Sequence, residues 1–376
     1  MAAFLAMGLI AQTTALGPAA PGVAGVLGLS AATAGMLVPV HNAGSLLGIL
    51  WWGRAQGRVP SARVLVLGVG LLLTGAVLVV LNPGAAASEV EATGVLVASD
   101  PRVGAFAGLV GAALLLGLGF GLLTAGVNTV VTARGVGAGV LNAMHGTYGG
   151  AAILFPLVVG FRDLRTVYVI VALGCLVLFA PIRRAQPLRR PPADGGAANR
   201  RSRPWVVMLT VAMGVEVGTG AWAATHLVGA GRAEDTASAA VAGFFAAFTA
   251  ARFLLAPIAG RTDPARIVRG GLVLAAVAAL AATITPLSVV AWVLVGIGIG
   301  PVFPTTLAWL LGSHQDDRAT TRLMVGGAIG GTLLPAAIGG VVAVVGTGAV
   351  PVAVAAIALA AWALARRLPG LVPAAS

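Results

Sequence analysis

The sequence predicts an all-α membrane protein with twelve transmembrane helices in two pseudo-symmetric six-helix bundles. Three observations predict this fold class: the composition, the number of long apolar stretches, and an internal repeat. Of the 376 residues, 59% are hydrophobic and 9% are charged, and the mean hydropathy is +1.00. A soluble domain carries about 25% charged residues, so the composition excludes an ordinary soluble protein and indicates a helical membrane protein.

Apolar stretches long enough to cross a bilayer occur twelve times. About 20 apolar residues in a helix cross a hydrocarbon core of roughly 30 Å. The expected spans are 2–28, 31–52, 62–82, 103–133, 139–161, 164–182, 204–229, 236–259, 266–285, 286–311, 321–346 and 348–365. No basic region precedes the first stretch, so we expect a membrane helix there and not a cleaved signal peptide.

The arginines predict the orientation of these spans. All 23 basic residues are arginine, and 18 of them lie in the even-numbered connections or at the C-terminus. Four lie in the odd-numbered connections, and Arg252 lies inside a span. Because basic residues stay on the cytoplasmic side, we expect a cell inner membrane protein with both termini in the cytoplasm. The Arg-rich segment 183–203 is interpreted as a cytoplasmic linker between an N-terminal bundle, 1–182, and a C-terminal bundle, 204–376.

The two predicted bundles resemble each other. GLGFG at 117–121 recurs as GIGIG at 296–300, an offset of 179 residues. A proline and a glycine recur at the same offset: Pro156 and Gly160, then Pro335 and Gly339. The glycine runs lie inside apolar spans without a βαβ context, so we interpret them as helix-packing positions and not as a dinucleotide fingerprint. Two repeated halves favour an alternating-access transporter.

Polar side chains avoid every third span. The third, sixth, ninth and twelfth spans consist almost entirely of apolar residues and are expected to face lipid. The polar residues inside the other eight are His41, Asn42, Thr124, Asn128, Asn142, His145, Tyr148, Glu216, Trp222, His226 and Arg252. Burying polar groups in lipid is costly, so we expect these eight spans to line a polar interior. Trp51 and Trp52, at the end of the second span, are interpreted as interfacial residues.

Glu216 is the only acidic residue inside any span. It lies 12 residues beyond Pro204, which is roughly 18 Å along a helix and close to the middle of the membrane. An acid at this depth is a functional candidate, and we expect it to carry a proton, with His145 as a second candidate. The alternative is a structural ion pair with Arg252 in the next span.

Asn142, His145 and Tyr148 are expected to share one helix face, where their donors and acceptors suit a hydroxylated solute. Further candidate solute contacts are His41, Asn42, Thr124, Asn128 and Trp222. Each has a structural alternative: Trp222 could anchor at the interface, Asn128 could bind backbone, and the others could join helices.

Other classes of site have little support. One cysteine, Cys175, excludes intrachain disulfides and cysteine clusters, and the four histidines are scattered. We expect no metal, no cofactor, no nucleic-acid partner and a monomer in the lipid bilayer. The loop residues His314, Asp316 and Asp317 are interpreted as a solvated turn, so we do not expect an enzyme.

Four stretches resemble the major facilitator superfamily, and within it the fucose–galactose–proton symporter branch. They are LNAMHGTYGGAAILFP from Leu141, GVEVGTGAWAATH from Gly214, ARFLLAPIAGR from Ala251 and GIGIGPVFPTTLA from Gly296. The resemblance implies the major facilitator fold and proton-coupled import of a sugar or related solute. Gly17 and Thr124 stand where that branch carries its coupling acids. If transport is coupled to protons, the resemblance therefore implies that Glu216, with His145, carries them; the alternatives are a facilitator without coupling and coupling to another ion. The competing interpretation is a multidrug or metabolite exporter of the same superfamily.

Overall fold

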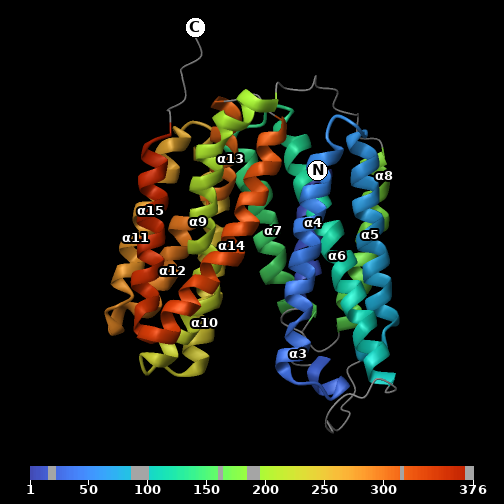
Figure 1. Cartoon of the computed structure of the whole chain (residues 1–376), viewed down its shortest axis with the longest axis horizontal. Coiled ribbons are helices and arrows are strands. Elements are labelled where there is room, and N and C mark those ends of the chain that lie inside the picture. The colour runs from blue at the N-terminus through green and yellow to red at the C-terminus, as the bar shows by residue number, and fades with distance from the viewer. Residues whose placement is uncertain (16–22, 86–100, 160–163, 184–194, 314–316, 369–376) are drawn as a thin grey trace. The chain divides into compact units, whose positions relative to one another are not determined.

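The computed structural model describes residues 1–15, 23–85, 101–159, 164–183, 195–313 and 317–368, and no β-strand occurs in these ranges (Figure 1). The chain divides into two compact units. The first unit is Met1–Val131 with Gly150–Pro191, and the second unit is Thr132–Gly149 with Pro192–Ser376.

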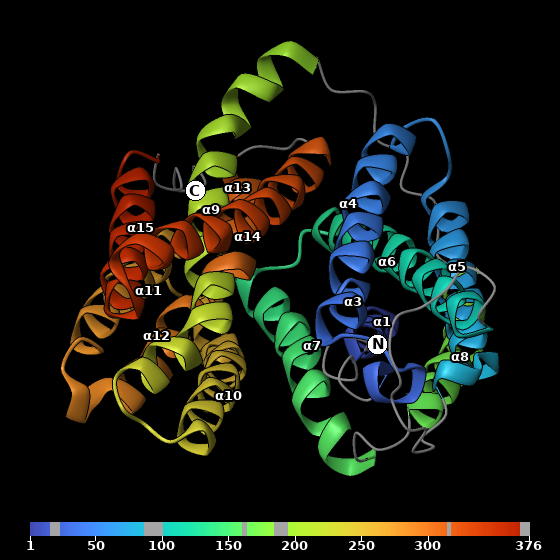
Figure 2. The ribbon, with the colours of Figure 1, turned by 60° about the horizontal axis from the view of Figure 1, so that its bottom comes forward.

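The first unit is built from antiparallel helices. Its elements are α1 (Ala2–Gln12), η1 (Thr13–Ala15), α3 (Ala31–Gly35), α4 (Leu37–Ala55), α5 (Ser61–Leu81), η2 (Pro83–Ala85), α6 (Pro101–Thr132), the end of α7 (Ala138–Val159) and α8 (Leu164–Arg183). Helices α5 and α8, the third and sixth predicted spans, lie side by side (Figure 2). Both expose large apolar residues such as Leu81, Leu176 and Val177, as a lipid-facing pair should.

The second unit repeats this plan. Its elements are the start of α7, α9 (Gly195–Gly229), α10 (Glu234–Ala259), α11 (Pro264–Ala281), η3 (Thr285–Leu287), α12 (Ser288–Ile299), α13 (Val302–Ser313), α14 (Asp317–Val345), η4 (Thr347–Ala349) and α15 (Val350–Arg366). Helices α11 and α15, the ninth and twelfth predicted spans, pack against each other. Asp263 caps α11 by accepting a hydrogen bond from the Ala265 N–H at 3.0 Å, and Pro264 at the first turn needs no donor partner.

Ten helices in the described ranges are long and apolar enough to cross a membrane. They coincide with ten of the twelve predicted spans. The other two are the first span, where the described part is the shorter apolar helix Ala2–Ala15, and the fifth, which is α7. The total of twelve and the two-bundle arrangement therefore remain predictions.

The predicted domain boundaries at 182 and 204 also remain predictions. Helix α9 already begins at Gly195, inside the predicted linker, and residues 184–194 lie outside the described ranges. The first half of α7, up to Gly149, groups with the second unit although it precedes the linker by more than 30 residues.

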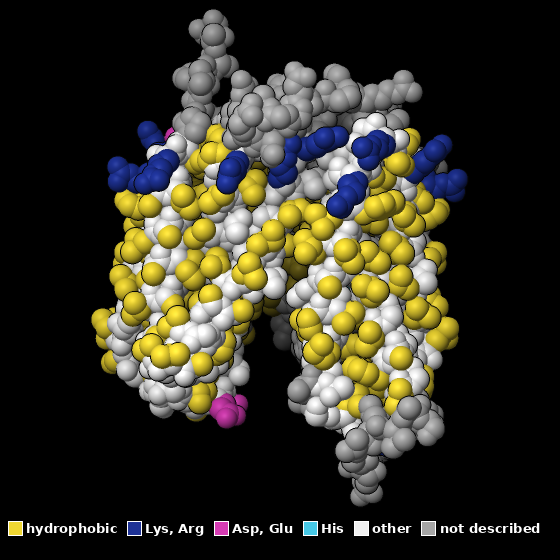
Figure 3. Space-filling model, viewed as in Figure 1, with side chains coloured by type: hydrophobic (Ala, Val, Ile, Leu, Met, Phe, Trp, Pro, Cys, Tyr) yellow, Lys and Arg dark blue, Asp and Glu magenta, His cyan; other side chains and the backbone are white. Residues whose placement is uncertain are grey.

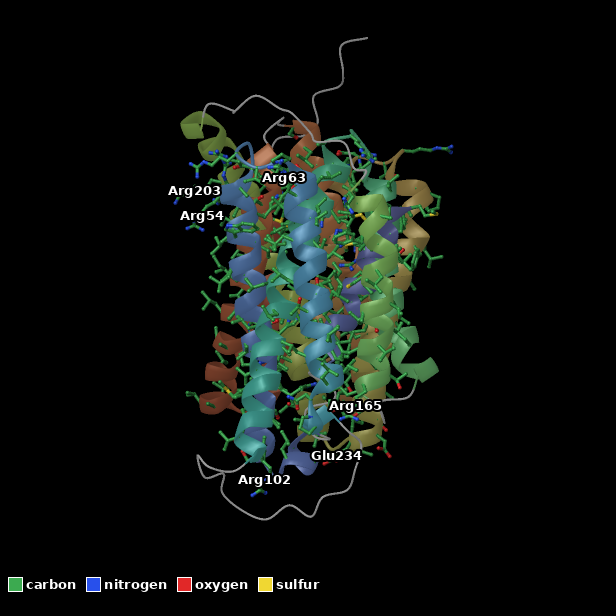
Figure 4. All side chains as sticks on the ribbon, turned by 90° about the vertical axis from the view of Figure 1, so that its right-hand side faces the viewer. Arg54, Arg63, Arg102, Arg165, Arg203 and Glu234 are labelled. Carbon is green, nitrogen blue, oxygen red and sulfur yellow. The ribbon has the colours of Figure 1, made fainter. Side chains whose placement is uncertain are left out.

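Charged residues mark the two ends of each unit. In the first unit, Arg54 and Arg63 lie at one end, and Arg102 and Arg165 lie at the other (Figure 4). In the second unit, Arg203 and Glu234 lie at opposite ends (Figure 4). On the face shown, yellow apolar side chains are spread over each unit between its ends (Figure 3).

Close helix packing explains the repeated glycine motif. A Cβ on Gly117 or Gly121 of α6 would collide with the backbone carbonyl of His41 or Ser45 on α4. A Cβ on Gly296 or Gly300, the equivalent positions, would collide with backbone carbonyls of α10. The middle glycines, Gly119 and Gly298, likewise lie against glycine carbonyls of α5 and α11. The predicted packing role of both motifs is confirmed.

The interpretation of Trp52 as an interfacial residue is wrong. Its side chain is 2% exposed, and its indole N–H donates to the Thr129 hydroxyl at 3.1 Å. Trp51, by contrast, is 41% exposed, as expected of a residue at the membrane interface. The neighbouring residues differ because successive positions on a helix lie about 100° apart, so α4 turns one indole toward α6 and the other outward.

Candidate polar site in the second unit

A break between α12 and α13 organises the candidate site. The equivalent helix of the first unit, α6, is continuous, but α12 ends at Ile299 and α13 begins at Val302. Pro304 has no N–H, so it cannot donate to the carbonyl of Gly300 one helical turn earlier. The Arg252 side chain supplies the missing donor, since its Nε lies 2.7 Å from the Gly300 carbonyl oxygen.

Two further contacts fix the Arg252 guanidinium. Its Nη1 donates to the carbonyl of His145 at 3.4 Å, and its Cζ lies 3.9 Å from the centre of the Phe248 ring. The side chain is 4% exposed. All three partners are neutral, and no carboxylate of the described residues lies within 4.0 Å of it. Arg252 is therefore a buried positive charge stabilised by carbonyl dipoles and a ring face.

Glu216 lies on α9 next to this charge. The charges of Glu216 and Arg252 interact, and Tyr148 interacts with both. Within the described chain, however, Glu216 forms neither an ion pair nor a hydrogen bond. Its side chain is half-buried. The carboxyl group is thus near a cation without forming a direct contact with it among the described residues.

The start of α7 completes this group, which we call the polar cluster: Asn142, His145, Tyr148, Glu216 and Arg252. Asn142 is fully buried, and its amide donates to the Ala138 carbonyl at 2.9 Å and to the Thr305 hydroxyl at 3.0 Å. Its Oδ1 is buried and accepts no hydrogen bond. The His145 ring meets the Phe303 ring edge-on, with the centroids 5.1 Å apart.

Glycines let α7 approach α10 closely enough to form the polar cluster. A Cβ on Gly139 would collide with the carbonyl of Ala256, one on Gly149 would collide with the side chain of Thr249, and one on Gly146 would lie 3.1 Å from the Phe253 ring. The sequence pattern predicted that Asn142, His145 and Tyr148 share a face, but it gave no sign that this face meets Arg252.

Trp222 contacts α14 and not the polar cluster in the described part of the chain. Its indole N–H donates to the carbonyl of Pro335 at 2.9 Å, and the ring packs on Gly339. This half-buried side chain therefore joins α9 to α14. Its neighbour His226 similarly joins α9 to α12, because its Nδ1 accepts from the Trp292 indole N–H at 3.2 Å.

The remaining candidates lie in the first unit. His41 is buried, with its Nε2 3.3 Å from the Thr13 hydroxyl and its ring edge-on to Phe120, and it also interacts with the exposed Asn42 side chain. Asn128 donates to the Thr124 carbonyl at 2.8 Å, inside its own helix. The Thr124 hydroxyl is buried without a hydrogen-bond partner. Gly17, His314 and Asp316 lie outside the described ranges.

The sequence pattern missed a second polar group around His41. The Tyr168 hydroxyl donates to the Thr13 carbonyl at 3.0 Å, and Gln12 donates to the Ala151 carbonyl at 2.9 Å. These contacts join the end of α1 to α7 and α8. Three adjacent polar residues, Gln12, Thr13 and Thr14, interrupt an otherwise apolar stretch, and this interruption could have indicated the group.

The polar cluster offers a titratable acid, a fixed cation, a phenol and an amide inside a membrane-spanning unit. No group of three or more histidine, cysteine or acidic side chains that could hold a metal occurs among the described residues. The arrangement suits the binding of a polar solute together with a proton.

No protein-family model and no curated protein matches the sequence. Solved structures match nearly all of it. The E. coli fucose:proton symporter FucP is similar over 98% of both chains, with a TM-score of 0.78 and 15% identity. The proton:xylose symporter XylE matches 98% of this chain and 95% of its own, with a TM-score of 0.72 and 12% identity. A bacterial homologue of the iron transporter ferroportin matches 98% of both chains, with a TM-score of 0.76 and 13% identity. This chain is therefore a multi-pass membrane protein with the fold of the major facilitator superfamily transporters.

Proposed function

We propose that the chain is a secondary transporter that moves a small polar solute, a sugar or a related compound, across the cytoplasmic membrane by alternating access with a proton. The observation that carries this proposal is Glu216: an acid within a membrane span, next to a fixed cation, without an ion pair or hydrogen bond among the described residues. Such an acid can bind and release a proton as its surroundings change.

Structural similarity supports the class of function. Two of the similar structures are named as sugar:proton symporters, and a third is named as a homologue of an iron transporter. In this proposal Glu216 carries the proton, with His145 as a second carrier. The candidate solute contacts are Asn142, Tyr148 and Trp222 in the second unit and His41, Asn42, Thr124 and Asn128 in the first. The polar character of these residues favours a hydrophilic solute over the amphipathic cargo of a multidrug exporter.

Solute-driven proton entry tests the proposal directly. In proteoliposomes that contain an internal pH dye, a panel of sugars and polyols is added outside. We expect internal acidification with at least one solute, because inward symport brings a proton with each solute molecule. Liposomes without protein are the control. If no solute of the panel acidifies the liposome interior and cells that express the protein export amphipathic dyes, the proposal is overturned in favour of the exporter.

The proposed orientation places both termini in the cytoplasm. Cys175 is fully buried, so the natural chain gives little background in thiol labelling. We expect a membrane-impermeant maleimide to label Thr236→Cys, at the start of α10, in intact spheroplasts. Arg58→Cys, in the turn after α4, should react only after permeabilisation, since Arg-rich connections face the cytoplasm. The opposite pattern would overturn this orientation.

A further inference from the structure

We infer that the solute of the proposed transporter carries a carboxylate, as a sugar acid does, and that Arg252 binds it. The inference rests on the proposed function and names its substrate class. Its first support is the surroundings of the guanidinium. The Nε and Nη1 atoms bind the carbonyls of Gly300 and His145, and Phe248 covers one face. Nη2 has no partner among the described residues.

A buried guanidinium with only neutral partners is incompletely compensated. Carbonyl dipoles and a ring face lower the cost of burying the charge, but a full counter-charge lowers it further. Guanidinium groups bind carboxylates through charge-assisted hydrogen bonds, and the planar fork of arginine fits the two carboxylate oxygens. An anionic group at Nη2 would therefore complete the coordination of Arg252.

The charges around Glu216 decide when this anion binds. Among the described residues, the charged or titratable groups that interact with Glu216 are Arg252 on α10 and Tyr148 on α7. Helix α14, which packs on α9, has none between Leu323 and Val345. With Glu216 ionised, the charges of Glu216 and Arg252 balance, and a solute carboxylate would be repelled. With Glu216 protonated, Arg252 is left in excess and attracts an anion. Proton and anion therefore bind together.

Tyr148 and the other polar cluster side chains indicate the rest of the solute. A phenol hydroxyl, a histidine ring and a buried amide provide neutral donors and acceptors that suit hydroxyl groups. A hydroxylated carboxylate, a uronate or an aldonate, matches both parts of the cluster. A neutral sugar would match the hydroxyl-binding part but leave the Arg252 charge without a partner when Glu216 carries a proton.

The charge of the solute can be read from the electrical behaviour of transport. One carboxylate and one proton together carry no net charge, so the uptake of a sugar acid should respond to the pH gradient and not to the membrane potential. A neutral sugar moving with a proton would carry one positive charge, and its uptake would rise with an inside-negative potential. Proteoliposomes in which potassium and valinomycin set the potential independently of the pH gradient separate the two cases.

The experiment compares galacturonate with galactose, and glucuronate with glucose, as radiolabelled solutes. For one pair at least, we expect uptake of the acid to exceed uptake of the neutral sugar by about tenfold or more, since a charged hydrogen-bonded contact is worth that much. Potential-independent uptake of the acid would support the inference. Transport of the neutral sugars without the acids would overturn the inference and leave the proposed function standing. If none of the four solutes is taken up and no solute of the wider sugar panel drives proton entry, both the inference and the proposed function are overturned.

Two variants separate the proposed binding of the solute by Arg252 from the hydrogen bond that Arg252 donates to the Gly300 carbonyl. Pro304→Ala restores an N–H that can donate to the Gly300 carbonyl, so the Gly300 carbonyl no longer depends on Arg252. In that background, Arg252→Gln should keep a monodisperse, thermally stable protein while uptake of the acid falls by about tenfold or more. Undiminished uptake in the double variant would overturn the inference. If the double variant does not fold, the comparison of acid and neutral solutes in the unmodified protein still decides it.

Discussion

Glu216→Gln is expected to abolish accumulation of the solute against its gradient while leaving exchange of solute across the membrane intact. Glutamine has nearly the same shape as glutamate but cannot bind and release a proton. The Glu216 carboxyl forms no hydrogen bond or ion pair in the described chain, so its replacement breaks no such contact there. We expect the free energy of unfolding to change by less than about 1 kcal/mol.

Two assays on the same proteoliposomes measure this prediction. Uptake driven by a pH gradient should end with equal solute concentrations inside and outside, whereas counterflow into solute-loaded liposomes should stay within about twofold of the unmodified protein, because exchange needs no net proton movement. Glu234→Gln, an exposed acid at the start of α10, is the matched control and should accumulate solute normally. Loss of both activities together with poor folding would show that Glu216 acts as a structural partner of Arg252 and not as the proton carrier.

Local pattern was enough to predict most of the helices and the role of the glycine repeat. Apolar length alone identifies a span, and α5, α11 and α15 begin and end close to their predicted limits. The glycines at 117–121 and 296–300 could be interpreted because small residues at this spacing have one common use in membrane helices.

The contacts of Arg252 could not be predicted in the same way. They join α10 to α7, 107 residues away along the chain, and to the break after α12, 48 residues away. The sequence did contain one indication of these contacts, because Pro304 leaves the carbonyl of Gly300 without a helical donor. Which side chain supplies that donor depends on the packing of α10 against α12, and that packing is a property of the folded unit. The burial of Trp52 is a similar case, because it depends on where α6 lies.

Gly121→Leu is expected to prevent folding of the first unit. A Cβ at Gly121 already collides with the carbonyl of Ser45, and a backbone atom cannot move aside as the end of a side chain can. Gly117, one turn earlier, lies against the His41 carbonyl in the same way. On α4, Gly44 and Gly48 lie equally close to backbone carbonyls of α6. The two helices must therefore separate along their whole crossing. Overpacking costs roughly 1–3 kcal/mol or more at a single site, and here it also removes the close contact that holds α4 to α6.

Gly111→Leu is the matched control on the same helix, because a Cβ at Gly111 has nothing within 4 Å. It should change the free energy of unfolding by less than about 1 kcal/mol. Size-exclusion profiles and melting curves of the purified proteins measure both variants. If the glycine repeat has the same use in both units, Gly300→Leu should fail to fold as Gly121→Leu does, since its side chain would meet the Phe248 carbonyl. Equal stability of Gly121→Leu and Gly111→Leu would show that α4 and α6 do not depend on this contact, and the packing account of the repeat would be wrong.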